Sequence, residues 1–224
     1  MTVPFGWGRN GNGDHPDDFE AARERLVEQL AGRIDRPSTE AAMRTVPRHE
    51  FVPEHRRDDA YTDRPLPIGN DQTISAPHMV AEMVDKLALE SGEDVLEIGT
   101  GCGYHAAVTA EVVGADHVYS VEYHRDLAEQ ARERLDRLGY GEISIRVGDG
   151  HAGWPDHAPY DAVYLTCAAE TFPSALIEQV RVGGRLLGPI GRRQRLVLAE
   201  KRSDGSLDRS EHGYVRFVPM QGEE

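Results

Sequence analysis

The first third of the chain combines helix-spaced apolar residues with a long polar stretch. After Asp17, apolar residues recur every three or four positions, which predicts a helix that Asp17 or Asp18 caps. The apolar positions of this helix are Phe19, Ala22, Leu26, Leu30 and Ile34. A shorter helix is predicted over 38–46, and residues 47–77 hold five prolines, which predicts a long irregular segment. Residues 1–16 are rich in glycine and asparagine and predict a flexible tail.

From residue 77 onward, helical and strand-like patterns alternate. Helices are predicted over 77–89, 105–113, 125–138 and 172–180, and strands over 94–99, 117–122, 143–147, 161–166, 185–190 and 195–200, with 214–219 closing the chain. This alternation predicts an α/β fold with a doubly wound, mostly parallel sheet. We expect one domain over 17–224, in which residues 17–76 form a helical and loop extension and residues 77–224 form the core.

The composition narrows the possible partners and surroundings. Thirty-nine acidic residues face 25 basic ones, a net charge of −14, which should repel a phosphate backbone and disfavours nucleic-acid binding. No apolar run reaches the ~20 residues that a membrane span needs. Two cysteines argue against a disulfide framework and favour a cytoplasmic protein. Only Lys86 and Lys201 are lysines, and we expect an acidic surface suited to high salt on a monomeric protein.

A glycine-rich turn is the strongest local motif. A hydrophobic strand carries Glu97 near its end and then passes through Gly99, Gly101 and Gly103 into a helix. Glycines let the backbone approach a ligand closely, and ligands of open α/β sheets bind at the carboxyl ends of the strands. The spacing differs from the Gly-x-Gly-x-x-Gly of nicotinamide dehydrogenases, because Tyr104 stands at the position of the third glycine.

Two further acids stand at the ends of the next two strands. Glu122 is placed to bind both ribose hydroxyls of a nucleoside, and Asp149, followed by Gly150, is placed to bind an adenine amino group. A nucleoside cofactor without phosphate fits this set, and Glu97 would direct negative charge toward a cationic methionine end. The predicted cofactor is therefore S-adenosyl-L-methionine, with S-adenosyl-L-homocysteine as the product.

The segments around this turn resemble one family. Residues 46–53 read Val-Pro-Arg-His-Glu-Phe-Val-Pro, and residues 72–78 read Gln-Thr-Ile-Ser-Ala-Pro-His. Together with later blocks, they resemble the protein-L-isoaspartate O-methyltransferase family over about residues 20–220. The resemblance implies a Rossmann-like class I methyltransferase that methylates the α-carboxylate of L-isoaspartyl residues in damaged proteins and so starts their repair through a succinimide.

The resemblance also implies roles for particular residues. Ser75 is the expected catalytic hydroxyl, which orients the substrate carboxylate. The expected substrate-binding residues are Thr73, Ile74, Ser75, Thr166, Cys167 and Ala168. The expected cofactor-binding residues are Gln72, Thr73, Ser75, His78, Glu97, Gly99, Thr100, Gly101, Gly103, Glu122, Tyr123, Asp149 and Gly150. His78 could instead be bonded locally at the start of its helix, and no metal-ligand spacing is present.

The chemistry requires no general base, because a substrate carboxylate is already ionised near neutral pH. One departure from the family pattern is Asn70-Asp71 before Gln72, where glycine is common; the added acid could weaken carboxylate binding. Two alternatives to isoaspartyl repair remain at this point. One is a paralogue that methylates another carboxylate or a small molecule, and the other is a cofactor-binding protein without turnover.

Overall fold

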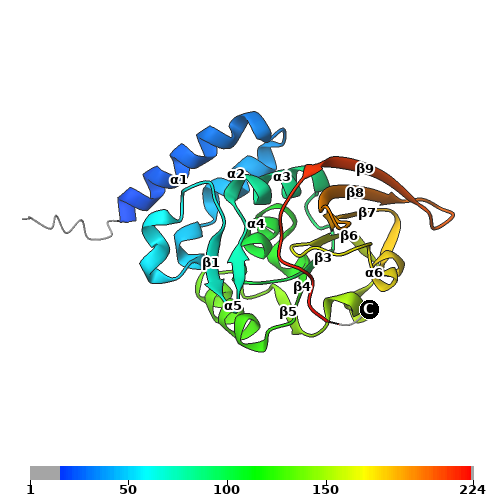
Figure 1. Cartoon of the computed structure of the whole chain (residues 1–224). Coiled ribbons are helices and arrows are strands. Elements are labelled where there is room, and N and C mark those ends of the chain that lie inside the picture. Colours follow the sequence, from blue (N-terminus) through cyan, green and yellow to red (C-terminus); the bar gives the residue numbers. More distant parts are fainter. Residues whose placement is uncertain (1–15, 223–224) are drawn as a thin grey trace, which may run out of the picture.

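The computed structural model describes residues 16–222, which form a twisted sheet with helices packed around it (Figure 1). The helices are α1 (Pro16–Leu30), α2 (Pro37–Thr45), α3 (Pro77–Leu87), α4 (Tyr104–Val113), α5 (Arg125–Arg137) and α6 (Ser174–Gln179). The strands are β1 (Leu66–Gly69), β2 (Gln72–Ile74), β3 (Val95–Ile98), β4 (Val118–Glu122), β5 (Ser144–Val147), β6 (Tyr160–Leu165), β7 (Val180–Ile190), β8 (Arg195–Lys201) and β9 (Leu207–Tyr214).

The main sheet of the described chain has seven strands in the order β5-β4-β3-β6-β7-β8-β9. The strands from β5 to β7 run parallel, and β8 and β9 each pair antiparallel with their preceding neighbour. The chain leaves β3 toward β4 and β5 and later returns on the other side of β3 as β6. This reversal creates a crevice at the carboxyl end of β3, where open α/β sheets bind ligands. The predicted doubly wound, mostly parallel α/β fold is confirmed.

Alternate residues of the central strands enter two different hydrophobic cores. On β6, Ala162 and Tyr164 pack with the core that contains α1 to α4, whereas Val163 and Leu165 pack with α6 on the other face. This follows from the two-residue repeat of a strand, whose successive side chains point to opposite faces. Because both faces of these strands are covered, their sequences are continuous apolar runs, and such runs predict buried strands.

Several predicted boundaries are wrong. The segment 47–77 is not simply irregular, because β1 and β2 form an antiparallel hairpin within it. Strand β9 was missed, since an edge strand with exposed, charged side chains lacks apolar alternation. Strand β7 begins at Val180 rather than residue 185, and α6 begins only after Pro173. Helix α1 begins at Pro16, so Asp17 and Asp18 follow its first residue; the rest of the predicted tail lies outside the described residues.

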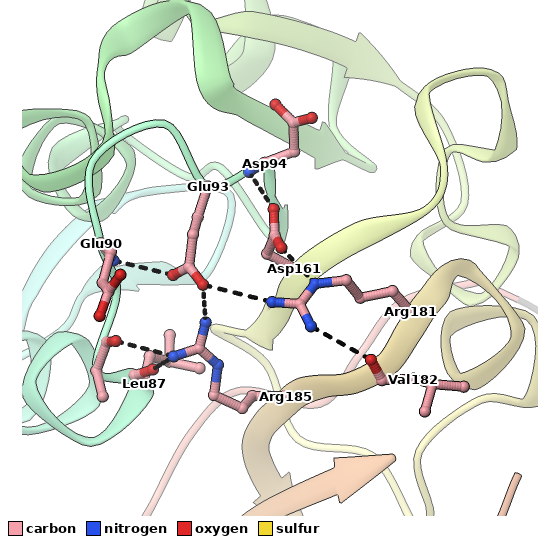
Figure 2. A network of polar contacts seen from close by, with 9 residues as sticks. Leu87, Glu90, Glu93, Asp94, Asp161, Arg181, Val182 and Arg185 are labelled. Atoms are coloured by element: carbon pink, nitrogen blue, oxygen red, sulfur yellow. Dashed lines mark hydrogen bonds and ion pairs between the residues drawn. The ribbon is translucent and has the colours of Figure 1, made fainter. Parts of the chain in front are cut away.

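An ion-pair network joins the amino-terminal ends of the strands, at the end of the sheet opposite the crevice. Arg185 on β7 donates to the carbonyl oxygens of Leu87 and Ala88, at the end of α3, over 2.6 and 2.8 Å. Its guanidinium also pairs with Glu93, which lies within 3.7 Å of Arg181 (Figure 2). Arg185 therefore connects the carboxyl end of α3 to the sheet, through its hydrogen bonds to two backbone carbonyls and its ion pair with Glu93.

A second acid extends this network to the start of β3. Asp161 accepts the backbone N–H of Asp94 over 2.8 Å and also pairs with Arg181 (Figure 2). The two arginines differ in burial, since the side chain of Arg185 is 18% exposed and that of Arg181 is 43% exposed. The more buried arginine should contribute more to stability, because solvent screens exposed ion pairs.

Replacing Arg185 should therefore destabilise the fold more than replacing Arg181. We expect Arg185→Gln to lower the free energy of unfolding by about 2 kcal/mol, because it removes the charged partner of Glu93 with the lower exposure and the side-chain donor of two helix-end carbonyls. The matched Arg181→Gln should cost less than about 1 kcal/mol. Urea unfolding of both variants measures the difference, and equal losses would contradict this account.

Candidate active site

An open-sided cavity of about 760 Å³, solvent at its mouth included, lies at the carboxyl end of β3. Its walls come from the β1–β2 hairpin, the glycine-rich turn, the ends of β4 and β6, and the last residues of the described chain. The structure brings together in this lining twelve of the predicted site residues: Gln72, Thr73, Ile74, Ser75, Gly99, Thr100, Gly101, Glu122, Tyr123, Gly150, Thr166 and Cys167.

The glycine turn packs directly against the loop that follows β6. Gly99 has φ of +101°, and a Cβ at this position would lie 2.3 Å from Oγ1 of Thr166. The same hydroxyl donates to the carbonyl oxygens of Ile98 and Gly99, over 3.0 and 2.6 Å. Any side chain at residue 99 would both strain the backbone and displace Thr166, so glycine is required here.

The β1–β2 hairpin packs close to the glycine turn. A Cβ at Gly101 would lie 3.3 Å from Cδ1 of Ile68, which shows how closely the two segments approach. The hairpin turns at Asn70 and Asp71, whose φ angles of 51° and 55° suit these two residue types. The side-chain amide of Asn70 donates to both carboxylate oxygens of Asp126 on α5, over 2.9 Å each, which anchors the hairpin.

Glu122 is the predicted acid that faces the cavity. Its carboxylate accepts the backbone N–H groups of Gly101, over 2.8 Å, and of His124, over 3.0 Å. A carboxylate has about four lone-pair sites, so two remain for ligand hydroxyls. The two amide bonds hold the acid at the end of β4 in one orientation, as a ribose-binding group requires.

Glu97 lies behind the cavity wall. It is fully buried and accepts hydrogen bonds from Ser120, over 2.5 Å, and Tyr164, over 3.0 Å. Burial raises the pKa of its carboxyl from 4.5 to about 8, so the group is mostly protonated near pH 7. The sequence predicts that Glu97 directs a negative charge into the cavity; the structure instead buries its side chain in β3, outside the cavity lining.

Four other predicted residues are also absent from the lining. His78 donates its backbone N–H to Asp63 over 2.9 Å and places its ring Nδ1 2.8 Å from the same carboxylate, which supports the alternative of local bonding. Asp149 accepts the backbone N–H of His151 over 2.9 Å. Gly103, with φ of +89°, caps α4. Ala168 contributes its backbone to the pairing described next.

The C-terminal segment forms a wall that the sequence did not reveal. The N–H of Ala168 donates to the carbonyl of Val218, and the N–H of Met220 donates to the carbonyl of Ala168, both over 2.8 Å. The red segment after β9 in Figure 1 consequently runs back beside the carboxyl end of β6. The lining residues that sequence reasoning missed are Val80, Ile98, Cys102, Tyr104, His105, Val121, His124, Val218, Pro219, Met220 and Gln221. Within this set, His105 carried a usable signal, since it is a polar residue directly after the glycine turn.

The site fits a nucleoside cofactor without phosphate. Side chains are excluded at Gly99, and also at Gly150, where a Cβ would lie 2.4 Å from Cγ2 of Ile98. The cavity wall at β4 offers the oriented carboxylate of Glu122 for hydroxyl groups. In residues 16–222, no three His, Cys, Asp or Glu side chains gather as metal ligands, and no helix has the length and apolar character to cross a membrane.

A mostly parallel, doubly wound sheet with a glycine turn and an acid at the end of the neighbouring strand binds nucleotide-like ligands at the carboxyl ends of its strands. Its fold matches that of class I methyltransferases. The sequence profile of the protein-L-isoaspartate(D-aspartate) O-methyltransferase family matches residues 21–224. The chain belongs to this family.

Individual relatives agree with this assignment over most of their length. Protein-L-isoaspartate O-methyltransferase 2 of Archaeoglobus fulgidus is 50% identical over 209 residues, which cover 92% of this chain and 95% of the relative. The Methanopyrus kandleri protein-L-isoaspartate O-methyltransferase is also 50% identical, over 212 residues that cover 92% and 94% of the two chains.

Solved structures match the fold as well. A protein-L-isoaspartate O-methyltransferase superposes with a TM-score of 0.82 and 32% identity, covering 89% of this chain and 66% of that one. The corresponding Plasmodium falciparum protein, solved in complex with S-adenosyl-L-homocysteine, has a TM-score of 0.79 and 24% identity, covering 89% and 98%.

The protonation of Glu97 should be visible in the pH dependence of stability. Its raised pKa means that the folded protein holds a proton that the unfolded chain releases above about pH 4.5. The stabilising contribution is therefore present at low pH and is lost as the pH rises through about 8. We expect Glu97→Gln to flatten this decline, measured as the free energy of unfolding between about pH 5 and about pH 8.

A control separates this effect from the general titration of carboxylates. Glu142 is exposed, so Glu142→Gln should retain the decline seen in the wild type. A wild-type protein that gains stability relative to Glu97→Gln on going from about pH 5 to about pH 8 would show that the buried carboxyl is ionised.

Proposed function

We propose that this chain transfers the methyl group of S-adenosyl-L-methionine to the α-carboxylate of L-isoaspartyl residues in damaged proteins. The observation that carries the proposal is the placement of Thr73, Ile74 and Ser75 in the lining of the same cavity as the glycine turn. The family membership and the names of the relatives support the same reaction.

When bound, the cofactor supplies a methyl group on a cationic sulfur. The residues of this chain then have to hold an anionic carboxylate in line with that methyl group and keep water away. No general base is needed, because the attacking carboxylate has a pKa of roughly 3.5 and is already ionised. Opposite charges diminish as the bond forms, so a site with little water favours the transfer.

Ser75 is the residue we assign to the carboxylate. Its hydroxyl has no hydrogen-bond partner within residues 16–222, so its proton is available to a ligand. Thr73 and Ile74 precede it along the same wall, and Thr166 and Cys167 close the cleft from the end of β6. Burial raises the pKa of the Cys167 thiol to about 12, which keeps it protonated and suits a packing role rather than nucleophilic attack.

The product explains why this reaction repairs proteins. In the α-methyl ester, the neighbouring backbone nitrogen attacks the ester carbonyl carbon and methanol leaves, which is far easier than loss of an oxygen from the free carboxylate. The succinimide therefore re-forms without further help from the enzyme. Hydrolysis of the succinimide returns part of the chain to normal aspartate. The alternative is a paralogue that methylates another carboxylate or a small molecule, and paired peptides separate the two.

Wild-type protein should methylate an L-isoaspartyl peptide and leave the matched aspartyl peptide unmodified. Ser75→Ala should lower kcat/KM for the isoaspartyl peptide by about 10- to 100-fold, the loss expected for one hydrogen bond to a charged group. Labelled S-adenosyl-L-methionine and base-labile methyl ester provide the measurement. Ser75→Thr keeps the hydroxyl and should retain more activity than Ser75→Ala. Transfer to neither peptide by wild-type protein that binds the cofactor would refute the proposed substrate.

Asp71 offers a second test, because it places an exposed negative charge next to Gln72, which lines the cavity. Asp71→Asn keeps a residue that tolerates the turn and removes the charge. We expect KM for the isoaspartyl peptide to fall about twofold at low salt, with the difference vanishing at high salt. Asp204→Asn, in the β8–β9 turn at the opposite edge of the sheet, is the control. An unchanged KM at low salt would show that Asp71 does not repel the substrate.

We further propose that the protein works as a cytoplasmic monomer with an acidic surface suited to high salt. The net charge of −14 in a chain with two lysines supports this. Salt screens repulsion among surface carboxylates, so the free energy of unfolding should rise as potassium chloride is added. Maximal stability in dilute buffer would contradict the salt adaptation, and sedimentation tests the monomer.

A further inference from the structure

His105 is a buried polar side chain that the proposed mechanism leaves without a role. It occupies the first turn of α4, directly after the glycine turn, and is 6% exposed. Neither of its ring nitrogens has a hydrogen-bond partner among the described residues, although the residue lines the cavity. Buried donors and acceptors are normally paired, so this ring is missing a partner that a ligand could supply.

The surroundings hold the ring in a fixed position. It packs on Tyr164, with ring centroids 4.5 Å apart and planes tilted by 33°. The hydroxyl of Tyr164 donates to Glu97 and lies 3.1 Å from Oγ1 of Thr109. Burial lowers the pKa of His105 to about 3, so the ring is neutral and offers one donor and one acceptor.

The position of the ring relative to β3 decides which part of the cofactor it would meet. Glu122 ends β4, on one side of β3, and binds the ribose in the proposed function. Tyr164 and Thr166 belong to β6 and the loop after it, on the other side of β3. His105 packs on this β6 side, so a cofactor whose ribose lies at Glu122 directs its amino-acid end toward His105.

The carboxylate is the better partner at this end. The first backbone N–H groups of α4 lack partners within the helix, and a helix N-terminus favours an anion. The carbonyl oxygen of Gly99, which accepts one hydrogen bond from Thr166, keeps a second lone pair at the glycine turn for the ammonium. The unpartnered ring and the helix start together form a place for a negative group.

We propose that His105 donates a hydrogen bond to the carboxylate of the cofactor's amino-acid end and so positions the sulfur and its methyl group. The inference rests on the proposed function for the identity of the cofactor. It assigns to His105 a contact that neither Glu122 nor the glycine turn provides.

The test compares two ligands by isothermal titration calorimetry. S-adenosyl-L-homocysteine carries the carboxylate, and its decarboxylated analogue S-adenosyl-3-thiopropylamine lacks it. His105→Leu should weaken binding of S-adenosyl-L-homocysteine by about 10- to 100-fold and change binding of the analogue less than about twofold. His105→Gln retains a donor and should recover much of the lost affinity.

A control variant distinguishes a specific role of His105 from a general loss of stability. Val108 is fully buried in the same helix outside the cavity lining, so Val108→Ala should lower the melting temperature without changing the ratio of the two affinities. Equal losses for both ligands, or no loss in His105→Leu, would overturn the role of His105 while leaving the cofactor assignment intact. Failure of wild-type protein to bind S-adenosyl-L-homocysteine would instead overturn the proposed function and this inference together.

Discussion

The close packing of the Gly99 backbone against the Thr166 side chain, at the end of β3, is the constraint on which the site depends. Gly99 leaves the sheet at a positive φ, and Thr166 fills the space that a side chain at residue 99 would need. The Thr166 hydroxyl then binds the carbonyls of Ile98 and Gly99, so β3 and β6 end in a single connected rim. Because the rim presents backbone and small side chains, a ligand can lie directly on it, and the β1–β2 hairpin can close over the ligand from the other side.

The two ends of the strands have different roles: the amino-terminal ends are held by ion pairs, and the carboxyl-terminal ends form the cavity. At the amino edge, Arg185 and Glu93 connect α3 to β7, and Asp161 extends the contacts to the start of β3 (Figure 2). At the carboxyl-terminal ends, the cavity is lined by glycines and by polar groups without hydrogen-bond partners among the described residues, such as the ring of His105. A binding cleft lacks the packing that side chains would provide there. The ion pairs at the amino-terminal ends of the strands help to keep the strands aligned.

The sequence predicted most of the central fold, because strands covered on both faces appear as apolar runs between amphipathic helices. It also placed Glu122 and the glycine turn in the cavity. It failed where a residue's environment depends on distant contacts. The burial of Glu97, which raises its pKa, depends on packing with neighbouring strands that carry Ser120 and Tyr164, and the bonding of His78 depends on Asp63. The wall formed by Val218 depends on pairing with Ala168, fifty residues earlier in the chain, and no local pattern encodes that pairing.

The polar residues near the cavity also differ in how directly they act. Ser75 and Glu122 face the ligand space, whereas Glu97 and Tyr164 lie behind it and support other groups. A carboxylate acceptor needs no base, so the demands on the site are mainly geometric: the cofactor must lie along the rim, and the substrate must reach it beneath the hairpin. The Asn70–Asp126 hydrogen bonds connect that hairpin to α5.

The most direct test of this account is a crystal structure of the protein with both S-adenosyl-L-homocysteine and an L-isoaspartyl peptide bound. We expect the cofactor product to lie along the glycine turn with its ribose on Glu122, and the peptide α-carboxylate to be hydrogen-bonded to the hydroxyl of Ser75. A peptide bound away from the Thr73–Ser75 wall, or a carboxylate held without Ser75, would contradict it.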